Sequence, residues 1–345
     1  MNRLLIIVAL TFLNPIAGNS QLTTFDAIPN GLVEVLGGWG MVTYDASFTG
    51  AVGHFTSFNT PFESDYGIEV GAILTTGTIY DIAGAGPHGP NNMESAGYDA
   101  GLPGDLLITN LLGGVETYDA ATLTFNVIAI SDTIQLSYIF GSEEYDEYIG
   151  SQFTDAMGIF ISGPSIPGML NIAKLPNGSF VTVNNVHSSG VNPFGNYSAI
   201  NGGSYLSNTG TSASAPHLQY DGLTVPLTAV AAVVPGEHYT ITVVVADAGD
   251  HVYDSGVFLI GRSLVAENEE ATLSSLSIHP NPTSEILNIE MSSIKSYDYS
   301  IISSDGKIVQ EGILTSTINV ESLIDGKYYL AIHSETPIVR VFQKQ

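Results

Sequence analysis

The sequence predicts an all-β protein whose main part is a β-sandwich or a jelly-roll-like fold. Short apolar runs alternate with polar residues at a period of two, which is the pattern of half-buried strands. Clusters of Gly, Ser, Thr and Asn separate these runs at short intervals, as in antiparallel sandwiches. Long segments with a period of 3.6 residues do not occur, so helices are not expected to build the core.

Two neighbouring runs show the strand pattern most clearly. Residues 123–129 and 134–140 each place an apolar side chain at every second position, and Ser131 and Asp132 stand between them. A short polar turn between two alternating runs predicts a β-hairpin. Further strands are expected at residues 157–163, 180–185, 239–247 and 255–261.

Two segments rich in Gly, Asn, Ser and Pro are expected to form long loops, at residues 82–105 and 188–217. Loops of this length in a compact domain are usually functional or disordered. Tyr197, Tyr205 and Tyr220 lie in or beside the second segment, and we expect them to contact a saccharide or a protein, because Tyr offers a large amphipathic surface at low entropic cost.

The first twenty residues have the pattern of a secretory signal peptide. Arg3 precedes an apolar run from Leu4 to Leu13, and small residues follow, with cleavage expected before Gln21. The run is about half the length of roughly 20 residues that a membrane-spanning helix needs. No later segment is long and apolar enough to cross a bilayer, so the mature chain is expected to have no transmembrane segment.

The charge of the chain excludes two classes of partner. The formal net charge is −26, and residues 22–264 contain 23 Asp and Glu against only two cations, Lys174 and Arg262. Such a chain has no basic surface for nucleic acid or for anionic membranes. Solvent, hydrogen-bond donors or metal ions must therefore satisfy most of these carboxylates. The absence of Cys excludes disulfides and thiolate metal sites.

Two acidic clusters lie where apolar strands end, and we expect them to bind Ca²⁺ if these strand ends share one edge of the sandwich. Calcium is held by oxygen ligands from loops, and like charges packed together are costly without a cation. The spacing is not that of an EF-hand, and a solvated edge whose side chains cap loop backbones stays equally open. Asp146 and Glu147 are expected to be solvated. The candidate ligands are Glu143, Glu144, Asp155, Asp247, Asp250 and Asp254.

Catalytic alternatives find less support. A carboxylate pair could hydrolyse glycosides, but the only Trp is Trp39, and sugar-cleaving clefts usually use Trp for stacking. A Gly-x-Ser-x-Gly motif does not occur. A zinc site built on His needs side chains to converge in a way that the sequence does not reveal, and it has no His-Glu-x-x-His motif.

The composition changes after an acidic linker predicted at residues 265–274, since five of the eight Lys and Arg lie in the last 51 residues. Residues 275–345 read as a small immunoglobulin-like β-sandwich, and they resemble the type A sorting domain of the type IX secretion system. The resemblance implies export across an outer membrane, removal of this domain, and release or surface attachment of the body. The motifs that carry it are Pro280-Asn281-Pro282, Leu287-Asn288-Ile289, Gly306-Lys307-Ile308-Val309 and Gly326-Lys327-Tyr328, with Lys344 near the end.

The body at residues 22–264 resembles, over about 55–263, the choice-of-anchor L family of bacterial extracellular domains. The family implies an extracellular location and no established catalysis. His187 departs from the pattern, where a further Asn is expected. The motifs include Gly71–Gly77, Asp119–Phe125, Phe140–Tyr145, Gly158–Pro164, Tyr220-Asp221-Gly222 and Ala246–Asp250.

The sequence as a whole thus predicts a non-catalytic adhesive or ligand-binding protein, secreted or held on the outer surface of a Gram-negative bacterium. Its expected partners are the type IX secretion machinery and an extracellular saccharide or surface protein. A secreted hydrolase acting on polysaccharide and a structural component of an extracellular matrix are the alternatives.

Overall fold

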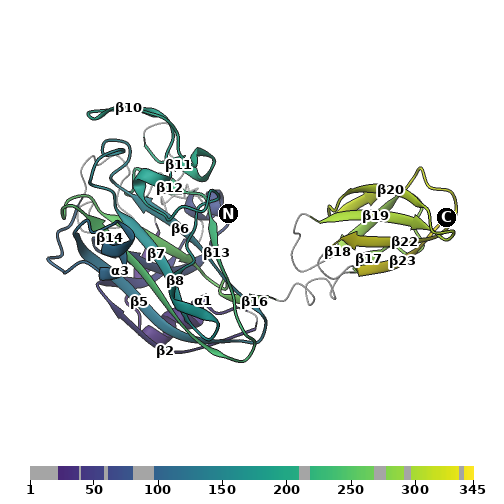
Figure 1. The fold of residues 1–345 in the computed structure, drawn as a ribbon, viewed down its shortest axis with the longest axis horizontal. Helices are drawn as coiled ribbons and strands as arrows, with labels where there is room; N and C mark the ends of the chain where they lie inside the picture. Colours follow the sequence, from purple (N-terminus) through teal and green to yellow (C-terminus); the bar gives the residue numbers. More distant parts are fainter. Residues whose placement is uncertain are drawn as a thin grey trace, which may run out of the picture.

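The structure, a computed structural model, is nearly all β and has two units with separate cores (Figure 1). We call residues 22–267 the main unit and residues 277–345 the C-terminal unit. The expected signal peptide and most of the expected linker lie outside the described residues. The described residues are 22–38, 40–57, 61–80, 97–209, 218–267, 277–290, 297–333 and 338–345.

The first sheet of the main unit has nine strands, all paired antiparallel. They run in the order β1-β3-β4-β15-β6-β12-β11, and β13 and β16 pair with other stretches of β6. The strands are β1 (Thr23–Phe25), β3 (Ala51–Thr56), β4 (Val70–Thr75), β6 (Thr133–Ser142), β11 (Tyr205–Ser207), β12 (Gly222–Thr224), β13 (Leu227–Ala232), β15 (Ser255–Ile260) and β16 (Val265–Glu267).

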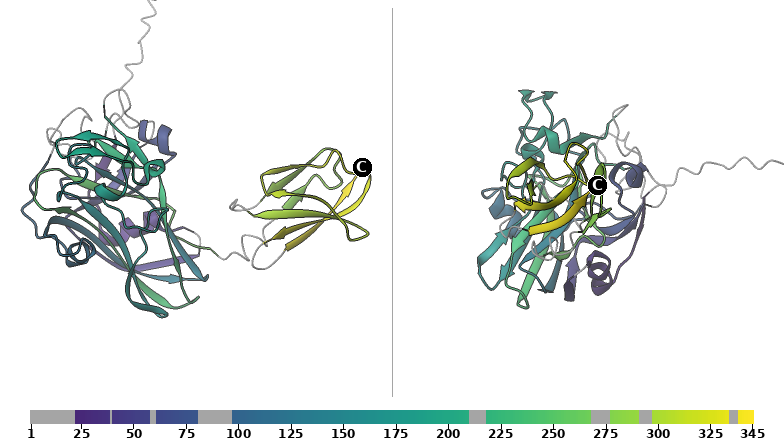
Figure 2. Two further views of the ribbon diagram at one scale, coloured as in Figure 1. Left: turned by 45° about the horizontal axis from the view of Figure 1, so that its top comes forward. Right: turned by 90° about the vertical axis from the view of Figure 1, so that its right-hand side faces the viewer.

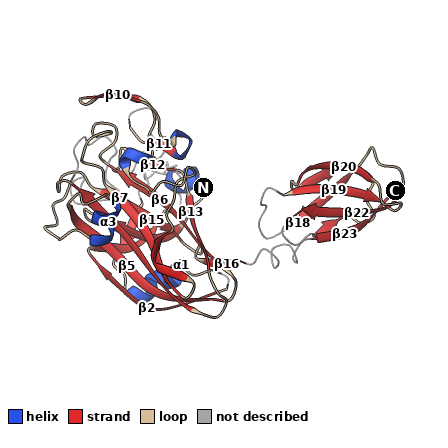
Figure 3. Ribbon diagram, in the orientation of Figure 1, coloured by secondary structure: helices blue, strands red, loops and turns tan. Residues whose placement is uncertain are grey.

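The second sheet has five antiparallel strands in the order β2-β5-β14-β7-β8, and a separate hairpin pairs β9 with β10. Short helices connect the strands (Figure 3). The strands are β2 (Met41–Thr49), β5 (Thr117–Ala129), β7 (Ala156–Gly163), β8 (Ile166–Asn171), β9 (Gly190–Asn192), β10 (Gly195–Tyr197) and β14 (His238–Ala248). The helices are α1 (Pro29–Leu36), α2 (Pro61–Tyr66), α3 (Leu106–Leu111), and the 3₁₀ turns η1 (Val183–Asn185) and η2 (Gly202–Ser204).

The main core lies between these two sheets (Figure 2). Alternate residues of β5, such as Phe125 and Val127, meet alternate residues of β6, such as Leu136 and Tyr138, and all four are buried. The all-β sandwich prediction is therefore confirmed.

The predicted hairpin between 123–129 and 134–140 is wrong. β5 pairs with β2 and β14, whereas β6 pairs with β15, β12, β13 and β16 in the other sheet. The chain therefore crosses from one layer to the other at Ser131 and Asp132. Apolar alternation fixes which face of a strand is buried, but two strands that share a core can lie in opposite layers as well as side by side.

Both sheets also carry apolar clusters on their outer faces. Phe62 of α2 packs against Phe55 and Phe258 on the nine-stranded sheet. Ile108 of α3 packs with Val244 and its neighbours on the five-stranded sheet. Strands covered on both faces read as continuous apolar runs, which explains why β14 is buried from Ile241 through Ala248 without alternation.

The loop predictions are resolved in part. Of the segment 82–105, residues 97–105 are described, and the expected loop at 188–217 contains β9, β10, η2 and β11. The expectation of ligand contact is wrong for Tyr205 and Tyr220, which are 8% and 1% exposed. The Tyr205 ring packs on Tyr145, and the Tyr220 hydroxyl lies 2.9 Å from the Thr75 hydroxyl. These rings fill the core instead.

The C-terminal unit is a small β-sandwich of two sheets around its own core. One sheet has the order β17-β18-β21 and the other β20-β19-β22-β23. Its strands are β17 (Ser277–His279), β18 (Ile286–Glu290), β19 (Asp298–Ser303), β20 (Ile308–Ile313), β21 (Thr317–Asn319), β22 (Gly326–His333) and β23 (Ile338–Lys344). The first residues of the expected linker, 265–267, form β16 on β6 instead, so the main unit extends to residue 267. None of the described helices is long and apolar enough to span a bilayer.

Candidate cation sites in the main unit

Two loops bring the predicted acidic clusters together at one end of the sandwich. One connects β6 to β7 and carries Glu143, Glu144 and Asp155, and the other connects β14 to β15. β6 pairs with β15 in one sheet and β7 pairs with β14 in the other, so both loops leave the same end. The Glu143 amide donates to the carbonyl oxygen of Asp254 at 3.0 Å. The condition set by the sequence, a shared edge, is therefore met.

Five of the six predicted ligands are buried rather than solvated. Glu143 is 2% exposed, and Glu144, Asp155, Asp247 and Asp254 are each 1% exposed. Asp250 is partly exposed, and its Oδ1 accepts a hydrogen bond from the Val252 amide at 3.1 Å. A plain solvated edge does not describe this arrangement, because buried carboxylates need donors or cations.

Hydrogen bonds satisfy two of the buried carboxylates. Asp155 accepts from the Ala248 amide at 2.9 Å and from the Ser255 hydroxyl at 2.6 Å. Asp254 accepts from the Tyr98 amide at 3.0 and 3.1 Å. The backbone comes so close to Asp254 that a Cβ on Gly77 would lie 2.0 Å from its Oδ2. These two side chains therefore help to fix the loops.

Three buried carboxylates keep oxygens without a hydrogen-bond partner. Both oxygens of Glu143, both of Asp247 and Oε2 of Glu144 are in this state. Gln219 lies close enough to Glu143, and Thr76 to Asp247, to favour their charged forms, and Asp247 in turn favours the charged form of Asp155. Unsatisfied buried polar atoms are rare in native proteins and call for an explanation.

Burial raises the pKa of the five buried carboxyls among the predicted ligands. Desolvation, with the charges of Asp221 and Asp254, raises the pKa of Glu143 to about 11. Desolvation also raises the pKa of Asp254 to about 8, and the charge of Asp155 adds to it. The pKa values of Glu144, Asp155 and Asp247 are raised by desolvation, and neighbouring carboxylates oppose the ionisation of Glu144 and Asp247.

The carboxylates form a connected series. The charge of Asp155 raises the pKa of Glu144, and the charges of Asp155 and Asp254 raise that of Asp247. The charge of Asp254 also raises the pKa of Glu143. Neither Lys nor Arg is among the causes of these shifts. Without an added cation, this environment favours the protonated forms of these carboxyls.

Sequence reasoning missed two further buried acids that belong to this end, Asp119 and Asp221, which are 1% and 6% exposed. The charge of Asp221 acts on Glu143, and that of Asp119 acts on Asp247 and Asp254. The available signal was their position, since Asp119 starts the apolar run of β5 and Asp221 directly precedes the buried strand β12.

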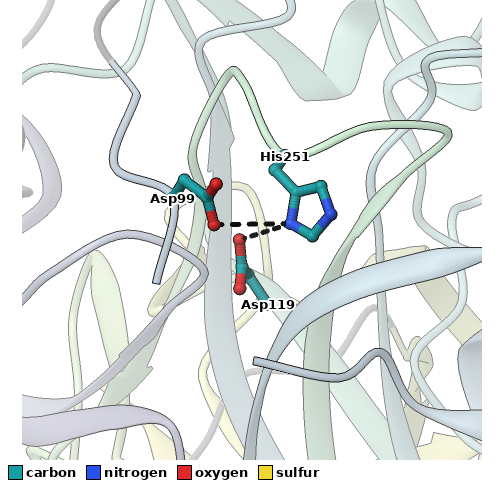
Figure 4. Close-up of side chains that lie close together, drawn as sticks. All are labelled: Asp99, Asp119 and His251. Carbon is teal, nitrogen blue, oxygen red and sulfur yellow. Dashed lines mark hydrogen bonds and ion pairs between the residues drawn. The ribbon is translucent and has the colours of Figure 1, made fainter. Parts of the chain in front are cut away.

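A second group joins one imidazole to two carboxylates (Figure 4). The Nδ1 atom of His251 lies 3.0 Å from Asp119 Oδ2 and 3.6 Å from Asp99 Oδ1. Among the residues that the structure describes, this is the one group of three or more such side chains whose ligand atoms all lie within 4.8 Å of one another. The six predicted ligands do not form such a group, so an ion among them would have to draw their oxygens closer.

Aromatic rings flank the acidic loops on the solvent side. Tyr148 packs against Phe153, Phe194 and Tyr253, with ring centroids 5.7, 6.2 and 5.0 Å apart. Phe194 sits between β9 and β10, in a hairpin that stands out from the main unit (Figure 1), and it is 57% exposed. Asn192 ties this hairpin to the acidic loop by donating to the carbonyl oxygens of Asp146 and Ile149 at 3.1 and 2.8 Å.

Comparisons with known proteins agree with the two-unit structure. Residues 33–265 match the family model described as Choice-of-anchor L domain, and residues 277–343 match that of the Secretion system C-terminal sorting domain. No curated protein matches the chain. Among solved structures, a beta-glucuronidase of Faecalibacterium prausnitzii matches at 10% identity and a TM-score of 0.16, over 88% of this chain and 46% of that one. The chain thus spans less than half of that enzyme, and so low a likeness carries no argument.

Proposed function

We propose, from its membership of the Choice-of-anchor L family, that this protein is a non-catalytic, calcium-stabilised binding protein of the cell exterior. It belongs to that family because the family model matches more than half of the chain. Its C-terminal sorting domain directs it through type IX secretion to the outer surface of a Gram-negative bacterium or beyond. The signal-like pattern of residues 1–20 fits the first step of this route.

The observation that carries the calcium proposal is the set of buried oxygens without partners on Glu143, Glu144 and Asp247. These three side chains offer free lone pairs within one connected series of carboxylates. Asp155 and Asp254 already accept hydrogen bonds and are better suited to holding the loops. We therefore narrow the six predicted ligands to three principal ones.

The donor set suits calcium in particular. It consists of oxygens only, two of its side chains lie on the β6–β7 loop and Asp247 lies near the end of β14, and Ca²⁺ accepts about six to eight oxygens at about 2.3–2.6 Å in flexible geometry. A doubly charged ion would also balance part of the negative charge that only Lys174 and Arg262 oppose in residues 22–264. The ion would replace the protons that the buried carboxyls otherwise retain.

A contact surface for the extracellular ligand is proposed at the β9–β10 hairpin. Val191 and Phe194 are 74% and 57% exposed there, beside the partly exposed ring of Tyr148. Apolar and aromatic side chains that gather on a projecting hairpin favour a binding surface. Since the acidic loop holds the hairpin through Asn192, an ion that orders this loop would also order the contact surface.

Thermal unfolding of the full chain tests the ion. An extracellular site has a Kd of about 10⁻⁴ M. Ca²⁺ at about one hundred times this Kd stabilises the native state by about 2.7 kcal/mol, which raises the Tm of a domain of this size by about 5–11 °C. Hydrogen exchange should become slower at residues 143–155 and 247–254. A Tm that is equal in Ca²⁺ and in EDTA would refute the proposal.

A second experiment separates binding from hydrolysis. The full chain is incubated with a panel of polysaccharides, and both its retention on the insoluble polymer and the release of reducing ends are measured. We expect retention without new reducing ends, and weaker retention for the double variant Val191→Ser with Phe194→Ser. Release of reducing ends that Glu143→Gln abolishes would favour the hydrolase alternative instead.

A further inference from the structure

We propose that Asp99, Asp119 and His251 form a second cation site, selective for a transition metal such as Zn²⁺. The site goes beyond the calcium proposal and uses none of the carboxylates with unpartnered oxygens, although the charge of Asp119 also acts on Asp247 and Asp254. Its three ligand atoms, Nδ1 of His251, Oδ2 of Asp119 and Oδ1 of Asp99, already lie within 4.8 Å of one another.

The three side chains come from segments far apart in the sequence, and backbone contacts hold these segments together. Asp99 follows Gly97, where a Cβ would lie 1.4 Å from the carbonyl oxygen of Val252. Only glycine allows this approach, which places Asp99 beside the loop that carries His251. Asp119 is the third residue of β5, and its own amide donates to the Leu102 carbonyl at 3.0 Å. The ligands therefore meet through packing of the main chain.

Each of the three side chains makes a further contact that restricts its orientation. Asp119 Oδ1 accepts from the Leu102 amide at 2.6 Å, which leaves Oδ2 directed at His251. Asp99 Oδ1 accepts from the Gly101 amide at 2.8 Å. The His251 ring packs on Tyr118, with centroids 4.1 Å apart. Such outer contacts fix the orientation of ligands in protein metal sites.

The ligand chemistry selects the class of metal. An imidazole nitrogen with two carboxylate oxygens suits Zn²⁺ and related borderline ions, whereas Ca²⁺ takes oxygen ligands alone. Three protein ligands leave the fourth tetrahedral position for water, as in open zinc sites. The side chains of His251 and Asp99 are 36% and 67% exposed, so an ion can enter from solvent, while that of buried Asp119 anchors the site from below.

The same distances also fit a protonated imidazole paired with two carboxylates. The two arrangements differ in what they do with a metal. A His–Asp ion pair has no need of Zn²⁺ and gives no spectroscopic signal with Co²⁺, whereas a ligand set binds one ion through Nδ1 and loses it when the imidazole is replaced.

Titration of the full chain with Zn²⁺ tests the site. The protein is first stripped with EDTA and then kept in excess Ca²⁺, so that any site built only of oxygens is filled. We expect one Zn²⁺ per chain by calorimetry, and Co²⁺ in its place should give visible ligand-field bands. His251→Gln and Asp99→Asn should each weaken Zn²⁺ binding at least about tenfold, since even outer contacts of metal ligands contribute that much.

His238→Gln is the matched control, because His238 is an exposed imidazole that contacts the Tyr44 hydroxyl at 2.6 Å and lies outside the proposed site. It should bind Zn²⁺ like the parent chain. Asp99→Asn decides the question if His251→Gln fails to fold, since Asp99 is the more exposed of the two. Absence of Zn²⁺ binding, or equal binding by the parent and both site variants, would overturn the inference.

Discussion

The two units of this protein manage charge in opposite ways. In the main unit, carboxylates lie buried in a series at one end of the sandwich, without Lys or Arg among the causes of their pKa shifts. In the C-terminal unit, acidic groups lie at the surface beside cations of the same chain, with Lys307 Nζ 2.9 Å from Asp305 and Lys344 Nζ 3.5 Å from Asp325. The proximity of Lys307 lowers the pKa of Asp305 to about 2.

The difference indicates where each unit obtains its positive charge. The Lys307–Asp305 pair is exposed, and the buried Lys344 is paired with the exposed Asp325, so neither pair needs a cation from outside the chain. The buried series can be neutral through protons or charged with a metal ion, and these two states suit different surroundings. We therefore expect the stability of the main unit, unlike that of the C-terminal unit, to depend on the pH and on the Ca²⁺ concentration of the medium.

The largest effect is expected from deleting the C-terminal unit, which tests whether export and the response to Ca²⁺ belong to different units. Deletion of residues 277–345 should abolish delivery to the cell surface and retain the protein inside the outer membrane, as measured by cell fractionation. The stabilisation of the main unit by Ca²⁺ should persist in the truncated protein, because the two cores are separate. Normal surface delivery after deletion would contradict the role of the sorting domain.

The next effect is on pH dependence without metal. A carboxyl whose folded pKa is raised stabilises the fold below its ordinary pKa, and this contribution is lost as the pH rises through the raised value. For Asp254 that loss extends to about pH 8. In EDTA, the Tm of the main unit should therefore fall by about 5 °C or more between pH 5 and pH 8.

Calcium should reverse this trend, because it binds the ionised carboxylates and competes with protons. The C-terminal unit provides the internal reference. The lowered pKa of Asp305 affects stability only as the pH falls from about 4 towards about 2. A main unit that is equally stable at pH 5 and pH 8 in EDTA would show that its carboxylates have other partners.

A single substitution should separate the metal from the fold. Glu143→Gln replaces a carboxyl that the raised pKa keeps neutral at pH 8 in the absence of metal. Its Tm in EDTA should therefore stay within about 2 °C of the parent, while the shift caused by Ca²⁺ should fall by at least about half. Calorimetry at pH 8 measures both quantities.

The matched control is Asp132→Asn. Asp132 is an exposed carboxylate at the connection between β5 and β6, and its Oδ1 accepts a hydrogen bond from the Thr133 hydroxyl at 3.2 Å. It should keep the full response to Ca²⁺. Were Glu143→Gln to respond like this control, Glu143 would not be a ligand.

The smallest effect is expected in the C-terminal unit. Lys307→Ala removes an exposed ion pair with Asp305, and the Tm of this unit should change by less than about 1 °C, since exposed pairs contribute little. A shift as large as that of Glu143→Gln in Ca²⁺ would mean that the two units do not differ in how they use charge.

Much of the fold could be predicted from the sequence, since the alternation of residues such as Phe125 and Tyr138 fixes buried faces. The pairing of the strands could not, because two alternating runs fit one core equally well from the same sheet or from opposite sheets. The prediction that Tyr205 and Tyr220 contact a ligand was wrong for a related reason. Both lie near polar loop residues in the sequence, yet the neighbouring strands cover them.

The candidate site divides in the same way. The excess of carboxylates over cations is a property of composition, and the position of Glu143 and Asp247 at the ends of apolar runs suggested that they could share one edge. Their near-complete burial and their unpartnered oxygens are visible only after folding. The convergence of His251 with Asp99 and Asp119 has no signal in sequence spacing at all.

The sequence by itself determined that this protein is an exported, acidic β-sandwich with a C-terminal sorting domain, because periodicity, composition and ordered motifs are local properties of the chain. Only the tertiary structure decided which carboxylates share one environment and how far water is excluded from them. Burial and proximity depend on contacts between residues as distant as Asp119 and His251, and those distances set both the pKa values and the ligand sets.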